Sequence, residues 1–230
     1  QAAEDSARYM FDRYWDESAG LLKWGEHNLV DLFTEGTVGL KGTQHELKGS
    51  LPYYDFLYQV DREKSRQMME GIWQAHLRDW NSLAFGRHGK YRPHKLDGSV
   101  WEKPWSDPGI DFEEGHLAFI ASGFELANGA LRAGHIENNP RIAQWGQRMV
   151  HQFVRQAHPK TKLIPSLLYH PTRDPNGDRV RRSYLHEYPQ AREKDTYIIG
   201  YQADLNTAML GMLTAAKELS DNKAVYTAGL

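Results

Sequence analysis

The sequence predicts a fold dominated by α-helices, arranged as antiparallel helix pairs in an α/α toroid. Apolar residues recur at three- and four-residue intervals over several long segments, which is the period of an amphipathic helix. Long loops rich in glycine and proline alternate with short turns between these segments, as expected for successive helix pairs. A chain of 230 residues is long enough for one large domain, so we expect a single domain over residues 1–230.

The N-terminal part is expected to form one helix followed by a small β-hairpin or meander. Apolar residues have helical spacing over residues 3–15, and Gly20 ends that segment. The following residues change to short apolar runs broken by turn residues, which is typical of strands. This β region near residues 21–40 carries His27, and its strands are expected at residues 21–24, 28–33 and 36–40.

Two helices are expected in the middle of the chain, where they form an antiparallel pair. The first begins near Glu46 and tolerates Pro52 in its first turn. The second begins after an N-cap at Asp61 and runs to about Trp80. Glycines and prolines are too frequent over residues 86–109 for regular structure, so we expect a long loop there.

The second half of the chain predicts further helices separated by one long loop. Helices are expected over residues 112–133 and 139–158, the latter with a proline in its first turn. A polar loop over residues 159–190 contains four arginines and could form a flap over a substrate. A last helix over residues 201–219 completes the expected pairs.

The composition excludes several classes of partner and site. Hydrophobic residues make up 40% of the chain, and no apolar run approaches the roughly 20 residues of a membrane span. With 28 basic and 30 acidic residues, no overall positive charge favours nucleic acid. We therefore expect neither a membrane nor a nucleic-acid partner. Because cysteine is absent, any metal ligands must be histidines and carboxylates.

The candidate site is organised around the short turn Gly86-Arg87-His88-Gly89. In an antiparallel helix pair, the start of the first helix and the end of the second lie at the same end, so Glu46 and His88 should meet. The strand that carries His27 leads into Glu46. Two imidazoles and one carboxylate suit a catalytic first-row divalent ion, such as manganese, zinc, iron or nickel, better than calcium.

The segments His45-Glu46-Leu47-Lys48, Pro52-Tyr53-Tyr54 and Gly86-Arg87-His88-Gly89 resemble polysaccharide lyase family 2, the pectate lyases with an α/α-barrel fold. The resemblance implies that His27, Glu46 and His88 bind the metal and that Arg87 is the catalytic base. It also implies a manganese-like ion, with zinc, nickel and cobalt as alternatives. Family members are longer and close a full barrel, so we expect this chain to be a piece of a longer protein or an incomplete barrel.

The function that this resemblance implies is cleavage of polygalacturonate or oligogalacturonides by metal-assisted β-elimination. Uronate carboxylates need cations, and sugar rings stack on flat aromatic side chains. A periplasmic or secreted location is favoured over the cytoplasm. The expected partner is thus an acidic polysaccharide, bound by Lys48, Lys90 and Arg92 and stacked on Tyr53 and Trp101.

Other functions remain open on the sequence alone. An α/α-toroid epimerase, isomerase or glycoside hydrolase could use histidine acid and base catalysis without a metal. Asp111 and Glu113 could supply the paired carboxylates of a glycoside hydrolase. A non-catalytic sugar-binding relative would retain the aromatic residues alone. Each site residue also has a simpler explanation, since a carboxylate near a helix start is stabilised by the helix dipole.

Overall fold

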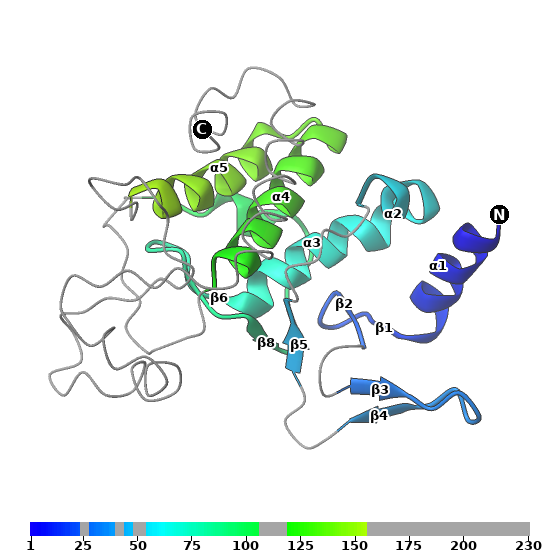
Figure 1. The fold of residues 1–230 in the computed structure, drawn as a ribbon. Helices are drawn as coiled ribbons and strands as arrows, with labels where there is room; N and C mark the ends of the chain where they lie inside the picture. Colours follow the sequence, from blue (N-terminus) through cyan, green and yellow to red (C-terminus); the bar gives the residue numbers. More distant parts are fainter. Residues whose placement is uncertain (24–27, 40–43, 48–53, 106–118, 156–230) are drawn as a thin grey trace, which may run out of the picture.

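The computed structural model describes residues 1–23, 28–39, 44–47, 54–105 and 119–155 (Figure 1). This part of the chain is rich in helix and carries small antiparallel sheets. Its helices are α1 (Ala2–Arg13), α2 (Tyr54–Val60), α3 (Arg62–His76), η1 (Ser99–Glu102), α4 (Ile120–Ile136) and α5 (Pro140–Arg155). The strand pairs are β1 (Trp15–Asp16) with β2 (Leu21–Leu22), β3 (Asn28–Val30) with β4 (Thr37–Gly39), β5 (Gln44–Glu46) with β8 (His88–Lys90), and β6 (Leu77–Asp79) with β7 (Ala84–Phe85).

Helices α4 and α5 form an antiparallel hairpin, which Figure 1 shows in green and yellow-green. Small residues let the two backbones approach closely, because a Cβ added at Gly146 would lie 2.7 Å from the carbonyl oxygen of Ala127. Helix α3 packs on α4, and the indole of Trp73 donates a hydrogen bond to the carbonyl of Leu126 over 3.1 Å. The helix-rich class is therefore confirmed, although the described helices do not close a barrel.

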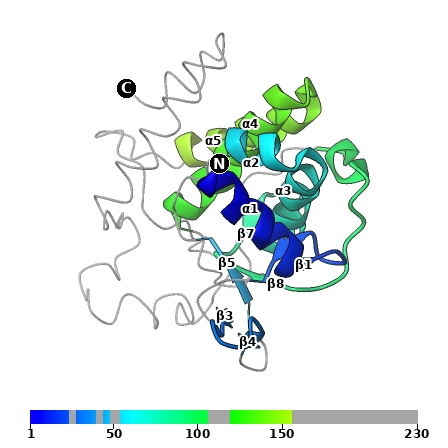
Figure 2. The ribbon, with the colours of Figure 1, turned by 90° about the vertical axis from the view of Figure 1, so that its right-hand side faces the viewer.

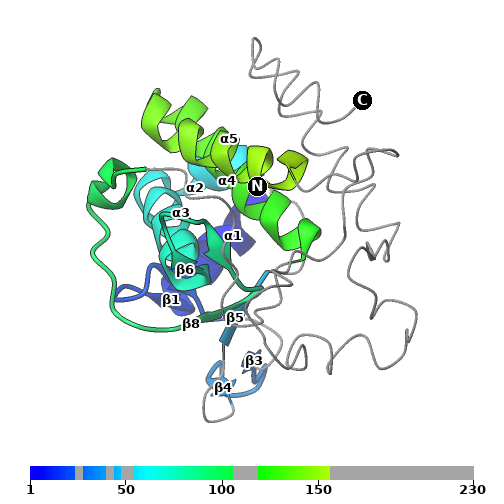
Figure 3. The same ribbon diagram turned by 90° about the vertical axis from the view of Figure 1, so that its left-hand side faces the viewer.

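The strands lie on one side of the helical layer, as Figure 2 and Figure 3 show from two opposite directions. The predicted β region near residues 21–40 exists, and its hairpin is β3–β4, which stands apart below the helices. Strand β2 pairs back onto β1 instead of joining this hairpin. Among the described residues, no helix is both long and apolar enough to cross a membrane.

The prediction that a helix begins near Glu46 is wrong. Residues 44–46 form strand β5, and the described part of helix α2 is Tyr54–Val60. Residues 88–90 form strand β8 instead of part of a loop, since the two segments pair with each other. Partners distant in the sequence therefore decide both conformations, which no local pattern reveals.

Helix α3 begins where predicted and ends earlier. The carboxylate of Asp61 accepts a hydrogen bond from the amide of Lys64 over 2.9 Å, as an N-cap should. The helix ends at His76 and not near Trp80. The chain continues as strand β6, which pairs with β7, and the side chain of Asp79 accepts hydrogen bonds from the amides of Asn81 and Ser82 in the turn between these strands.

The other helix predictions are confirmed in part where the structure describes them. Helix α1 matches the expected N-terminal helix, and α5 starts at Pro140 as expected. The helix expected over residues 112–133 is wrong at Phe119, whose backbone is extended, since α4 begins at Ile120 and continues to Ile136. The start of that helix, with Asp111 and Glu113, lies outside the described residues, as do the loop at 159–190 and the helix at 201–219.

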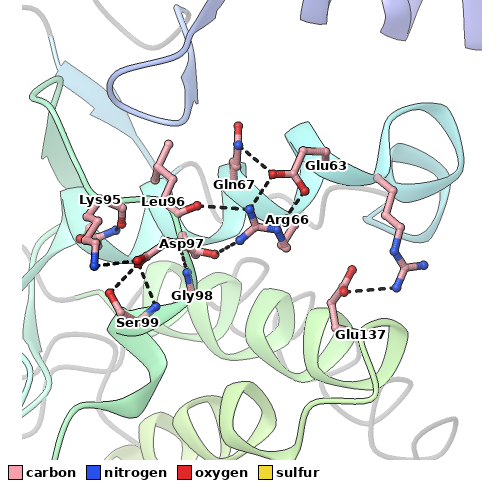
Figure 4. Close-up of polar contacts among 12 residues, drawn as sticks. Glu63, Arg66, Gln67, Lys95, Leu96, Asp97, Gly98, Ser99 and Glu137 are labelled. Carbon is pink, nitrogen blue, oxygen red and sulfur yellow. Dashed lines mark hydrogen bonds and ion pairs between the residues drawn. The ribbon is translucent and has the colours of Figure 1, made fainter.

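A buried carboxylate ties helix α3 to the segment that follows strand β8 (Figure 4). Glu70 is fully buried, forms an ion pair with Arg66 and accepts a hydrogen bond from the amide of Gly98 over 2.9 Å. Arg66 also donates to the carbonyl of Leu96 over 3.2 Å. Burial raises the pKa of Glu70, while these partners favour its charged form.

Arg66→Ala is expected to lower the free energy of unfolding by about 3 kcal/mol, because it leaves the Glu70 carboxylate buried without its cation. Adding Glu70→Gln should recover part of this loss, since the double variant buries no charge. Arg8→Ala is the control, because the Arg8–Glu4 pair is exposed. Urea unfolding followed by circular dichroism measures all three, and equal stability of the two arginine variants would contradict the prediction.

Candidate active site

Strands β5 and β8 place Glu46 and His88 side by side. The antiparallel register sets Glu46 opposite His88, His45 opposite Gly89 and Gln44 opposite Lys90. Side chains alternate between the two faces of a sheet, so Glu46, His88 and Lys90 share one face. The predicted proximity of Glu46 and His88 is therefore observed, although paired strands produce it and not the ends of two helices.

Arg87 joins this pair to form a triangle of polar atoms. Its Nε lies 3.2 Å from Nε2 of His88 and 3.4 Å from Oε1 of Glu46. The remaining side of the triangle, from Nε2 of His88 to Oε1 of Glu46, measures 3.5 Å. The amide of Leu47 donates to the carbonyl of Arg87 over 2.9 Å and fixes its backbone. The guanidinium also lies over the ring of Phe119, at the start of α4.

The electrostatics of this triangle fit a bound cation. Arg87 donates its N–H to Nε2 of His88, so this nitrogen presents a lone pair. A carboxylate oxygen and an imidazole lone pair lie 3.5 Å apart, and the guanidinium of Arg87 supplies the positive charge beside both, a place that a metal ion could also take. Two ligands of one metal ion, each bound at about 2.1 Å, lie roughly 3 Å apart. Glu46 and His88 therefore fit as two ligands of a divalent ion.

The third predicted ligand, His27, lies outside the described residues, as do the predicted substrate contacts Lys48 and Tyr53. Within the described part of the chain, no group of three or more histidines and carboxylates could hold a metal ion. Lys90 is exposed on the same face as His88. Arg92 is exposed, and its guanidinium donates to the carbonyl of Gln74 over 3.3 Å.

Trp101 belongs to the core and not to a sugar-binding surface. It is only 2% exposed, and its ring makes edge contacts with Trp73 and Trp80. Its carbonyl accepts the indole N–H of Trp145 over 2.9 Å, which ties η1 to α5. The high tryptophan content therefore reflects core packing to a large extent.

The opposite face of the β5–β8 sheet carries a buried pair of histidines, a role that the sequence did not indicate. His45 Nδ1 lies 2.7 Å from Nε2 of His76, and Nδ1 of His76 lies 2.9 Å from the carbonyl oxygen of Gly86. Burial lowers the pKa of His45 to about 4 and that of His76 well below its usual value. The apolar stripe of α3, on which His76 falls, was the available signal.

These two histidines predict a loss of stability as the pH falls through the range just below 6.5. The unfolded chain binds protons at each imidazole below about pH 6.5, whereas the folded protein does not until about pH 4 for His45. Stability should be full above pH 6.5 and fall by about 2 kcal/mol for His45 by pH 5, with a further loss in the same direction from His76. Urea unfolding between pH 7.5 and 5, in chelator, measures this. A flat profile would contradict the buried pair.

Comparisons with known proteins find similarity to pectate lyases. A family model described as periplasmic pectate lyase matches residues 1–228. A pectate disaccharide-lyase from Dickeya dadantii (strain 3937) is 34% identical to the chain over 167 residues. That alignment covers 68% of this chain and 30% of the relative, so the chain spans less than a third of the relative's length.

Proposed function

We propose, from the premise that this chain belongs to the periplasmic pectate lyase family, that it is a polysaccharide lyase acting on polygalacturonate or oligogalacturonides. The resemblance seen in its motifs is confirmed by the family match over nearly the whole chain. The observation that supports the proposed chemistry is the triangle of Glu46, Arg87 and His88. This triangle brings together two atoms that could bind a metal ion and one basic side chain, at one end of the short β5–β8 sheet.

The proposed reaction is β-elimination. The C5 proton of a galacturonate lies α to the C6 carboxylate; its removal is followed by expulsion of the C4 glycosidic oxygen and leaves a C4–C5 double bond. Glu46 and His88, together with His27, would hold a divalent ion, with manganese preferred over zinc, nickel and cobalt. When bound, such an ion supplies Lewis-acid stabilisation of the charge that develops on the C6 carboxylate.

Arg87 is the proposed base that takes the C5 proton. It lies beside both proposed metal ligands, so a substrate carboxylate near these ligands would have its C5 hydrogen within reach of the guanidinium. A guanidinium is normally protonated, which makes it a weak base in water. The neutral form of the guanidinium would be favoured by a divalent ion held by Glu46 and His88, because the two positive charges repel each other.

Cations on the same face would orient the polyanion. Lys90 is exposed beside His88, and Arg92 follows two residues later. We assign these two side chains, with Lys48 and Tyr53, to neighbouring galacturonates. The description of the family supports a periplasmic location.

Ultraviolet absorbance of the unsaturated uronide tests the reaction directly. The protein with Mn²⁺ and polygalacturonate should generate this absorbance, and a chelator should abolish it until Mn²⁺ is restored. Absence of an absorbing product from both polymer and oligomers would refute the lyase. Release of reducing ends without absorbance would identify a glycoside hydrolase instead, and activity that survives the chelator would refute the metal.

A further inference from the structure

One imidazole lies beneath the turn that carries Arg87 and His88. The amide of Gly86 donates to the carbonyl of His76 over 3.2 Å, and the ring of His76 bonds the carbonyl of Gly86 over 2.9 Å. At the other end of the turn, a Cβ added at Gly89 would lie only 2.6 Å from Nε2 of His76. The turn therefore contacts His76 at both of its glycines. The absence of a side chain at Gly89 leaves space for the His76 ring.

The same imidazole reaches the strand that carries Glu46. Its Nε2 lies 2.7 Å from Nδ1 of His45, the residue directly before Glu46 in β5. His45 is 6% exposed and His76 is fully buried, so this direct contact is shielded from bulk solvent. A chain of hydrogen bonds thus runs from Gly86 through both imidazoles to strand β5.

The protons in this chain follow from the chemistry of its ends. A carbonyl oxygen only accepts, so Nδ1 of His76 carries a hydrogen and donates to Gly86. Burial keeps the ring neutral, hence its Nε2 is an acceptor. Nδ1 of His45 must then carry the hydrogen that it shares with His76. Both rings are therefore required to be Nδ1–H tautomers.

The sheet that holds the site needs such support. Strands β5 and β8 have three residues each and pair only with each other among the described residues. An isolated two-stranded ladder is marginally stable in water. A shift of one residue in its register would also turn Glu46 away from His88.

We propose that His45 and His76 are positioning residues, whose hydrogen bond fixes the 86–89 turn against strand β5 on the core side of the sheet. This assignment rests on the proposed lyase function, because its purpose is to hold Glu46 at a set distance from Arg87 and His88. The pair itself does not touch substrate. Residues that orient metal ligands in this way typically change metal affinity or activity by about 10- to 100-fold when replaced.

The tautomers provide a test that needs neither metal nor substrate. Long-range proton–nitrogen NMR spectra of the full metal-free chain should show both rings as Nδ1–H, the minor tautomer of free histidine. Replacing each histidine with glutamine in turn assigns the signals. An Nε2–H tautomer at either ring would overturn the proposal.

Two replacements of His45 distinguish a positioning role of its side chain from a role in which the side chain only fills space. Asparagine places an amide donor close to the position of Nδ1, whereas leucine fills the space and donates nothing. His45→Leu should lower kcat and Mn²⁺ affinity by about 10- to 100-fold with KM nearly unchanged, and His45→Asn should recover most of both. His135→Leu, on the exposed end of α4, is the control and should match the wild type.

The outcomes distinguish this proposal from the proposed function. Equal effects of asparagine and leucine on kcat and on Mn²⁺ affinity, or a loss confined to KM, would overturn the positioning role. If the wild-type protein forms no unsaturated product, the lyase proposal fails. The tautomers and the Mn²⁺ affinities of the two variants would then still decide whether the histidine pair positions the ligands.

Discussion

Arg87→Ala is expected to lower kcat for β-elimination by about 10²- to 10⁴-fold, the range typical for loss of a general base. The guanidinium lies beside both proposed metal ligands, and alanine removes the group proposed to accept the C5 proton. Stopped-flow absorbance of the unsaturated product under single-turnover conditions measures the chemical step. A variant that retains more than a tenth of the wild-type rate would remove Arg87 from the role of base.

The same variant is expected to bind Mn²⁺ at least as tightly as the wild type. Arg87 places a positive charge 3.4 Å from Oε1 of Glu46 and donates to His88. This cation competes with a metal ion for the same two acceptors, so its removal cannot weaken binding electrostatically. Calorimetric titration with Mn²⁺ measures the affinity, with Arg92→Ala as the control. A large loss of affinity in Arg87→Ala would mean that the guanidinium supports the metal site.

The sequence predicted the proximity of Glu46 and His88 for a reason that differs from the structural one. It brought Glu46 and His88 together through the ends of a helix pair, whereas two short paired strands do so. Strands of three residues have no periodicity long enough to detect, and each is stabilised by a partner that lies far along the chain. The motif residues were recognisable, but the elements that hold them were not.

Helices were more predictable because their signals are local. The cap at Asp61 and the proline at the start of α5 mark helix starts within a few residues of sequence. The end of α3 was missed because residues 77–79 pair as strand β6 with β7, which overrides the apolar spacing. Trp101 was misplaced for another reason, since composition shows that tryptophans are numerous and not which of them are buried.

The role proposed for the histidine pair could not be predicted from the sequence either. Helical spacing places His76 on the buried stripe of α3, and alternation places His45 on the face opposite Glu46. Neither rule says that two buried imidazoles contact each other across 31 positions of sequence. Only the tertiary arrangement shows that the turn and the strand share one hydrogen-bonded chain.

Glu46→Gln is expected to lower Mn²⁺ affinity by at least about 100-fold and to abolish metal-dependent turnover with it. The carboxylate is the anionic ligand of the described pair, and glutamine keeps its shape while removing its charge. A neutral amide oxygen is a weaker ligand for a first-row divalent ion. The amide can also donate to Nε2 of His88 and thereby occupy the lone pair of the second ligand.

A change in folding would not account for this loss. The side chain of Glu46 is 3% exposed whereas its partner Arg87 is 29% exposed, so glutamine leaves only a partly solvated guanidinium without its carboxylate and no fully buried charge. Metal-free Glu46→Gln should therefore unfold within about 1 kcal/mol of the wild type. Glu137→Gln, past the far end of α4, is the matched control and should bind Mn²⁺ normally. Wild-type affinity in Glu46→Gln would show that the metal, if it assists this reaction, is held by other residues.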